Sequence, residues 1–252
     1  MDKVNFKKAV LVSMPVIFAV ALAITLAACM AQADRSLEDS ILGTGAPEES
    51  VQVIAPTLSE ELLPEFRSIG DGKCEVAGIG DGGAHLTVPA VSPKGETVVG
   101  IGDSAFLGLA SLKSITLPES VTYIGAYAFY GSSLERIELH DGVAEIGECA
   151  FSNCRALTGI FVDSGNEKYT DMDGVLYSRD KSELICYPSG RQNSSFTLRS
   201  GVTVIHKMAF YGCEALKSLN FNGTEEEWAR IRIAVGNDLL NVLSLSFPES
   251  DK

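Results

Sequence analysis

Basic residues are scarce in this 252-residue sequence, which has 20 lysines and arginines against 33 aspartates and glutamates and a formal net charge of -13. Nucleic-acid binding relies on clustered Lys and Arg side chains that neutralise phosphates. After Lys8 the basic residues stand singly, without interleaved aromatic side chains. The sequence therefore excludes nucleic acid as a partner and favours neutral or cationic partners.

Recognisable catalytic and cofactor motifs are also lacking. The sequence has no G-x-S-x-G segment, and its three histidines, His85, His140 and His206, lie far apart. A catalytic triad needs a nucleophile, a base and an orienting acid in one place, and the sequence offers no such constellation. We therefore predict that the protein is not an enzyme and takes no cofactor.

Paired-cysteine motifs are absent as well. The six cysteines include no C-x-x-C pair and lie away from the histidines, which argues against a zinc or other metal site. Cys154 and Cys213 each stand three residues after a repeated phenylalanine, and this equivalence favours packing over redox chemistry. Cys149 and Cys186 could pair in a disulfide, a question that the sequence leaves open.

A long apolar run occurs only at the N-terminus. Lys3, Lys7 and Lys8 precede an uncharged, mostly apolar stretch at positions 9–33, which is the organisation of an export segment. Lysines flanking such a segment remain on the cytoplasmic side. We therefore expect the chain after Asp34 to lie outside the cytoplasmic membrane.

The end of this apolar stretch, Leu26-Ala27-Ala28-Cys29, resembles a bacterial lipobox. The resemblance implies a signal peptide over residues 1–28 and lipidation of Cys29, which would anchor the protein to the membrane. Two alternatives remain: cleavage after Ala33, giving a secreted protein, and a retained N-terminal anchor. The chain from Asp34 to about Gly72 has no sustained hydrophobic period, so we predict that residues 29–72 form a lipid anchor site followed by a flexible tether.

A repeat occupies most of the remaining chain. The motif Ile-Gly-x-x-Ala-Phe recurs, the last time as a variant, with copies that begin at Ile101, Ile124, Ile146 and Ile205. An apolar skeleton of the form Leu-x-x-Ile-x-Leu accompanies it and begins at Leu112, Leu134, Leu157 and Leu216. The alternating end of this skeleton suits a strand with one face inward. Stacked copies bury that face, so the sequence predicts a repeat solenoid.

The segment from Leu112 to Ser132 nearly matches the pattern L-x-x-I-x-L-P-x-x-V-x-x-I-G-x-x-A-F-x-x-C, with Ser132 at the place of the cysteine, and is similar to the BspA-like bacterial leucine-rich repeat. The resemblance covers residues 73–252 and implies a mainly β, right-handed solenoid of about 22–23 residues per turn. It also implies an N-terminal cap over 73–100 and a C-terminal cap over 222–252. For some family members it implies surface adhesion or interaction with a host or matrix.

Two segments depart from the repeat. The spacing is lost after Val162, and we predict an insertion over 166–190 that contains a β-hairpin. Near the C-terminus, Thr224-x-x-Glu227 forms a capping box before Trp228. This pattern predicts a short helix whose indole seals the end of the solenoid.

Outward-facing strand positions form the candidate ligand-binding face, because solenoids present extended surfaces of this kind. Its predicted residues are Lys113, Thr116, Glu135, Arg136, Glu138, Thr158, Phe161, Lys217 and Asn220. Phe161 is aromatic where its equivalents in other repeats are Thr116, Glu138 and Asn220. It is either an exposed anchor for a partner or a side chain that lies beneath the insertion hairpin.

These observations predict an exported, membrane-tethered leucine-rich repeat protein at the bacterial cell surface. We expect it to act as a non-catalytic protein-binding or adhesion module, with a protein or glycan partner outside the cell. The alternative is a structural envelope component or a glycan-binding accessory lipoprotein. Self-association or retention by purified cell wall would favour that alternative.

Overall fold

The computed structural model describes residues 64–79 and 83–248. The predicted signal peptide, the lipidation site Cys29 and most of the predicted tether lie outside the described residues. A search of the described residues found no helix with the length and apolar character needed to cross a membrane. These described residues belong to one compact unit, which carries the repeats.

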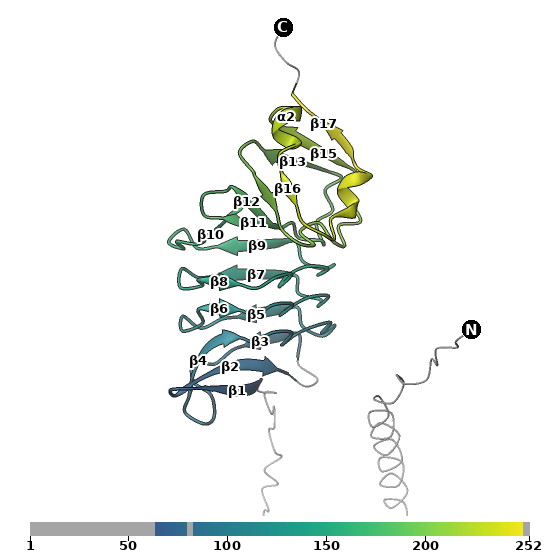
Figure 1. Cartoon of the computed structure of the whole chain (residues 1–252). Helices are drawn as coiled ribbons and strands as arrows, with labels where there is room; N and C mark the ends of the chain where they lie inside the picture. The colour runs from purple at the N-terminus through teal and green to yellow at the C-terminus, as the bar shows by residue number, and fades with distance from the viewer. Residues whose placement is uncertain (1–63, 80–82, 249–252) are drawn as a thin grey trace, which may run out of the picture. The chain divides into compact units, whose positions relative to one another are not determined.

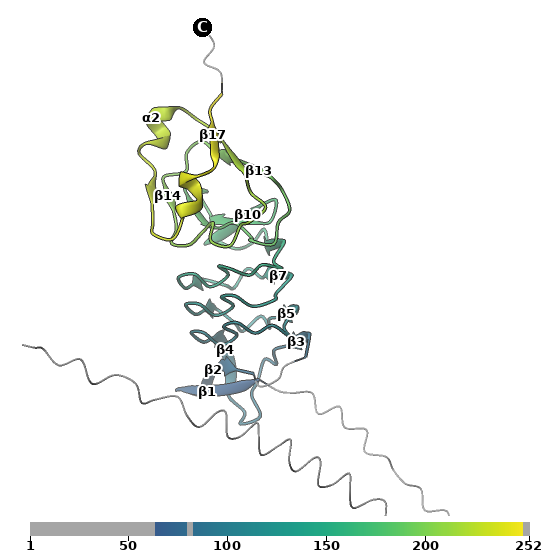
Figure 2. The ribbon, with the colours of Figure 1, turned by 90° about the vertical axis from the view of Figure 1, so that its right-hand side faces the viewer.

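The repeats form a mainly β solenoid of about seven turns with about 23 residues per turn, which confirms the predicted fold class. Figure 1 shows the turns stacked in chain order, with β1 at one end and α2 and β17 at the other. The edge-on view in Figure 2 shows the same stacking. Each turn contributes short strands that pair in parallel with those of the next turn.

Two sheets run through the first half of the solenoid. One contains β1 (Glu65–Gly70), β2 (Lys73–Gly78), β4 (Thr97–Ile101), β6 (Tyr123–Ile124) and β8 (Glu145–Ile146). The other contains β3 (His85–Thr87), β5 (Ser114–Thr116), β7 (Arg136–Leu139) and β9 (Gly159–Val162). The repeated isoleucines Ile101, Ile124 and Ile146 face one another in register, as the repeat alignment predicts.

Two further sheets form the second half, after the insertion. One contains β10 (Tyr169–Met172), β11 (Val175–Ser178), β12 (Glu183–Cys186), β14 (Val204–Ile205) and β16 (Arg232–Ile233). The other contains β13 (Ser195–Arg199), β15 (Ser218–Asn222) and β17 (Ser244–Ser246). The antiparallel pair β11 and β12 confirms the predicted hairpin, and β10 adds a third strand that the sequence did not predict.

The core is a ladder of equivalent side chains from successive turns. Phe106, Phe129 and Phe151 are fully buried and stack with ring centroids 5.2 and 5.5 Å apart. In the second half Tyr187 takes up the same role and stacks on Phe210 at 5.4 Å. Such aromatic pairs add about 0.5–1.5 kcal/mol each beyond the burial of their area.

The glycine of the Ile-Gly motif allows successive turns to approach closely. A Cβ on Gly125 would lie 2.5 Å from the backbone nitrogen of Asp103, and one on Gly147 would lie 2.4 Å from that of Ala126. In the variant copy this position holds His206, which lies beside the inserted strands rather than above a regular turn. The motif glycine is therefore required by contact between neighbouring backbones.

The N-terminal cap begins earlier than the sequence predicts, because β1 lies within residues assigned to the tether. β1 and β2 form an antiparallel hairpin around Gly70-Asp71-Gly72, whose three residues all have positive φ angles. Arg67 on β1 forms an ion pair with Glu75, which is buried and also accepts a hydrogen bond of 2.6 Å from the Tyr123 hydroxyl. These polar contacts hold β1 on the first turns and explain why residues 65–72 are folded.

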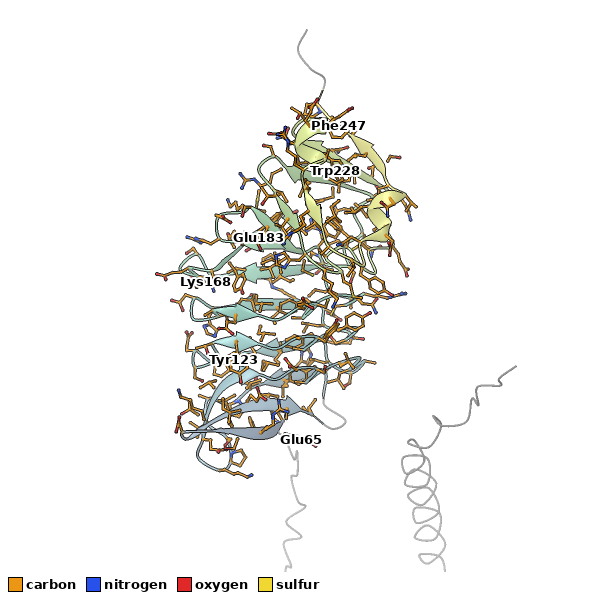
Figure 3. All side chains as sticks on the ribbon, in the orientation of Figure 1. Glu65, Tyr123, Lys168, Glu183, Trp228 and Phe247 are labelled. Carbon is orange, nitrogen blue, oxygen red and sulfur yellow. The ribbon has the colours of Figure 1, made fainter. Side chains whose placement is uncertain are left out.

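The C-terminal cap contains the predicted helix, α2 (Glu225–Trp228). Thr224 accepts a hydrogen bond from the Glu227 backbone, and the Glu227 carboxylate accepts one from the Thr224 backbone, so the capping box is complete. The half-buried Trp228 packs against Phe221 with ring centroids 5.5 Å apart. Figure 3 labels Trp228 and Phe247 at this end, which the 3-10 helix η1 (Asp238–Asn241) also covers.

Candidate binding face

Seven of the nine predicted binding residues lie on or beside the sheet formed by β3, β5, β7 and β9. This face is hollowed into a groove of about 500 Å³ that crosses β5, β7 and β9. The outward side chains of Thr116, Arg136, Glu138 and Phe161 line it, whereas the side chains of Ile115, Ile137 and Leu139 on the same strands are buried in the core. The groove therefore presents charged and aromatic side chains, including the arginine and aromatic types that are enriched at protein interfaces.

Phe161 is half-buried at the end of the groove, on the edge strand β9. Its ring lies over Gly159, where a Cβ would come within 2.6 Å of the ring atom Cε2. The guanidinium carbon of Arg136 stands 3.7 Å from the ring centroid on the neighbouring strand, and Arg136 also pairs with Glu138 at 3.0 Å. Gly159 thus makes room for a fixed stack of ring and guanidinium, a cation-π arrangement.

The insertion forms a wall at the open edge of β9. The turn between β10 and β11 covers this edge, because the Ile160 amide donates to the Gly174 carbonyl and the Val162 amide donates to the Asp171 carboxylate. A Cβ on Gly174 would stand 3.5 Å from the ring atom Cζ of Phe161. Phe161 therefore lies against the insertion, as one of the two sequence interpretations proposed, and still lines the groove.

The other predicted residues of this sheet lie at the edge of the groove. Lys113 forms an ion pair of 2.8 Å with Glu135 on the next turn, and both side chains are about half exposed. Lys113 lowers the pKa of the Glu135 carboxyl through its hydrogen bond and its charge. Thr158 donates to the Glu135 carbonyl at 3.1 Å. These ion-paired and hydrogen-bonded side chains leave little uncompensated charge on this side of the groove.

Lys217 and Asn220 belong to a different surface from the other seven candidate residues. Both lie at β15, which pairs with β13 and β17 and not with the strands of the groove. Asn220 bonds to Ser195 and Ser246 on the two neighbouring strands. The insertion causes the separation, because its turn at Asp171–Gly174 occupies the place where the next strand of the first sheet would pair.

The groove ends in an acidic group that no sequence motif predicts. His140 lines the groove after β7. One ring nitrogen of His140 and one carboxylate oxygen each of Glu119 and Asp141 lie within 4.8 Å of one another. However, His140 Nδ1 accepts a hydrogen bond of 3.1 Å from the Gly142 amide, and a metal ion would have to displace that bond. The arrangement therefore places the carboxylates of Glu119 and Asp141 near His140 at the end of the groove.

The described cysteines Cys74, Cys149, Cys154, Cys186 and Cys213 are all buried free thiols. Burial raises the pKa of Cys154 to about 11 and that of Cys213 to about 12. The Cys154 thiol donates to the Phe129 carbonyl at 2.9 Å, one turn below. The packing role predicted for Cys154 and Cys213 is confirmed, because a neutral buried thiol behaves as a small apolar group. Cys149 and Cys186 form no disulfide with each other.

The comparisons with known proteins agree with this architecture. The family model of the BspA type leucine-rich repeat region matches in six copies over residues 92–173 and 185–230. The chain therefore belongs to the BspA-type leucine-rich repeat family. A search among curated proteins found no match.

Among solved structures, the chain is similar to a leucine-rich cell surface protein from Faecalibacterium prausnitzii A2-165, with 31% identity and a TM-score of 0.55. The match covers 66% of this chain and 42% of that chain, so the sequence spans less than half the length of that protein. A leucine-rich repeat protein from Eubacterium ventriosum matches at 24% identity with a TM-score of 0.43, covering 56% of this chain and 54% of that chain.

Proposed function

We propose that this protein is exported, tethered to the membrane through Cys29, and acts at the bacterial cell surface as a non-catalytic protein-binding or adhesion module. The observation that carries the proposal is the groove over β5, β7 and β9, with its fixed stack of Phe161 and Arg136. The cell-surface description of the F. prausnitzii relative supports the location. The apolar N-terminal stretch supports export, and the lipobox-like segment supports the anchor.

The groove fits a protein partner because its features are those of an interaction hot spot. Aromatic and arginine side chains carry most binding energy at protein interfaces when neighbouring groups exclude water around them. Phe161 occupies the space left by Gly159 and Gly174, and Arg136 is oriented before binding by the Phe161 ring and by its ion pair with Glu138. Preorganised side chains lose little conformational entropy on association.

The test is a binding screen with the full chain in mild detergent against immobilised extracellular-matrix proteins and purified cell wall. We expect saturable binding to a matrix protein that falls about thirtyfold or more in Phe161→Ala, since loss of a hot-spot side chain costs about 2 kcal/mol or more. Asn220→Ala is the matched control, because it removes an outward side chain from the separate sheet. Equal affinity of Phe161→Ala and the parent chain would contradict the proposal.

A structural envelope component or a glycan-binding accessory lipoprotein is the alternative proposal. The open end of one sheet supports it, because among the described strands β17 pairs with β15 alone and its side chains are exposed. Retention by purified wall alone, or concentration-dependent self-association in analytical ultracentrifugation, would favour this function over protein binding.

A further inference from the structure

A second surface of the solenoid carries three tyrosines that come from distant parts of the sequence. Tyr127 and Tyr130 follow β6, whereas Tyr211 follows β14. The rings of Tyr127 and Tyr130 meet edge to face at 5.7 Å, and those of Tyr130 and Tyr211 stack at 6.4 Å with 25° between their planes. Tyr211 is 43% exposed, so the cluster presents aromatic surface to solvent.

Its backbone conformation and a lysine contact position Tyr127 within the tyrosine cluster. Tyr127 takes a left-handed backbone conformation with φ of 56°, the same conformation that Ser104 and Cys149 adopt at this repeat position. Lys207 holds the Tyr127 side chain from the far side of the insertion, donating to its hydroxyl at 3.0 Å and to the Glu148 carboxylate at 3.1 Å. The polar rim on this side therefore contains both a donor and an acceptor.

A hollow of about 340 Å³ adjoins the cluster and shares Tyr211 with it. Arg155, Glu214, Asp238 and Leu239 also line this hollow. Arg155 and Glu214 form an ion pair of 2.8 Å, yet both side chains are more than 60% exposed and retain free hydrogen-bonding capacity. The hollow therefore combines one exposed aromatic ring with guanidinium donors and carboxylate acceptors.

We propose that the tyrosine cluster and the adjoining hollow form a binding site for a neutral carbohydrate. A sugar ring offers an apolar C–H face that packs on an aromatic ring and hydroxyl groups that both donate and accept hydrogen bonds. Tyr211 supplies the ring, Arg155 the donors, and Glu214 with Asp238 the acceptors. The site is distinct from the groove, which uses Phe161 and Arg136.

The charges around the site favour a neutral ligand. Two cations, Arg155 and Lys207, stand with three carboxylates, those of Glu148, Glu214 and Asp238, which disfavours a polyanionic glycan. A proline-rich peptide also binds aromatic surfaces, but its imide nitrogens carry no hydrogen. Such a peptide offers few donors to Glu214 and Asp238, whereas sugar hydroxyls can donate to these carboxylates and accept from Arg155.

The test is titration of the full chain in detergent with three probes: cellohexaose, maltohexaose and a hexamer of N-acetylglucosamine. We expect at least one to bind with a micromolar to millimolar Kd, and Tyr211→Ala to weaken that binding by about tenfold. Tyr211→Phe keeps the ring and should change the affinity by less than threefold. Glu214→Gln removes the charge of an acceptor and should weaken binding severalfold.

Controls separate this site from the groove and from misfolding. Phe161→Ala should leave oligosaccharide affinity unchanged, and Tyr211→Ala should leave binding to a matrix protein unchanged. Circular dichroism melting reports whether each variant remains folded. Absence of binding to all three oligosaccharides, binding to a polyproline peptide instead, or equal affinity of Tyr211→Ala and the parent chain would overturn the proposal.

Discussion

At the residue scale, Gly159 illustrates how one missing side chain shapes the candidate site. Phe161 lies flat over Gly159 and beside Arg136 because no Cβ occupies that space. A similar relation holds on the other sheet, where the Tyr123 ring covers Gly100 and reaches Glu75 with its hydroxyl. In both places a glycine in a strand lets an aromatic ring lie across the sheet.

We therefore expect Gly159→Ala to destabilise the fold by about 1–3 kcal/mol, the usual cost of forcing an extra carbon into a packed site. The cost should almost disappear in a Phe161→Ala background, where the clashing ring is gone. Urea unfolding of the four proteins in this double-mutant cycle measures the coupling. Additive effects of the two substitutions would contradict the packing described for Phe161.

The buried thiols predict a dependence of stability on pH. In the unfolded chain a thiol ionises near pH 8.5, but in the folded protein the pKa of Cys154 is about 11 because burial disfavours the thiolate. The folded state thus retains a proton that the unfolded state loses, so the free energy of unfolding falls as pH rises between about 8.5 and 11. Each such thiol contributes a slope of up to about 1.4 kcal/mol per pH unit.

The measurement is urea unfolding at pH 7.5, 9 and 10 for the parent chain and for Cys154→Ala. The substitution leaves a small cavity and lowers stability at every pH, but it should also make the decline at high pH shallower. Parallel pH dependences in the two proteins would contradict the raised pKa of Cys154.

At the scale of the structural element, the turn is built around two kinds of glycine with different causes. Gly125 has no room for a Cβ because the preceding turn lies against it. Gly108 has open space around it but a φ of 65°. This left-handed backbone conformation disfavours every residue other than glycine. Gly125 is therefore required by the contact between successive turns, and Gly108 by the backbone conformation of its own turn.

The two causes predict different costs. Gly125→Ala should destabilise by about 3 kcal/mol, because it forces neighbouring backbones apart, whereas Gly108→Ala should cost about 1 kcal/mol from its backbone conformation alone. Thermal unfolding followed by circular dichroism ranks the two variants. A larger loss in Gly108→Ala than in Gly125→Ala would contradict the account of the repeat.

Substitution of Trp228 tests whether the C-terminal cap stabilises the solenoid. Its indole packs on Phe221 beside the capping box, so Trp228→Ala should cost about 3 kcal/mol through loss of a large aromatic side chain. Trp228→Phe keeps most of the contact and should cost less than half as much. An unchanged melting temperature in Trp228→Ala would contradict a stabilising role for α2.

The repeat could be predicted from the sequence because equivalent residues occupy the same packing position in each turn. Phe106, Phe129 and Phe151 reveal the ladder by their spacing alone. The hairpin of β1 and β2 was missed because it occurs once and depends on Glu75 meeting Arg67 and Tyr123, the latter 48 residues away. A contact made once, between distant residues, leaves no period in the sequence.

At the scale of the whole molecule, the insertion divides the solenoid into two halves. The described chain has one core cluster centred on the phenylalanine ladder and a second that contains Tyr187, Phe210 and Phe221. The same division interrupts both sheets, ends the groove at Phe161 and places Asn220 on a separate surface. The candidate residues were predictable from their outward positions, but their separation was not, because the path of the insertion is set by tertiary contacts.

The central claim is that a partner binds in the groove over β5, β7 and β9. The most direct measurement places a photo-cross-linking side chain at Thr116, which lines the groove, or at the equivalent position Asn220 on the separate sheet, and illuminates each protein with the matrix protein retained in the binding screen. We predict a covalent adduct from position 116 and none from position 220. An adduct from position 220 alone, or from neither position while binding persists, would contradict the account.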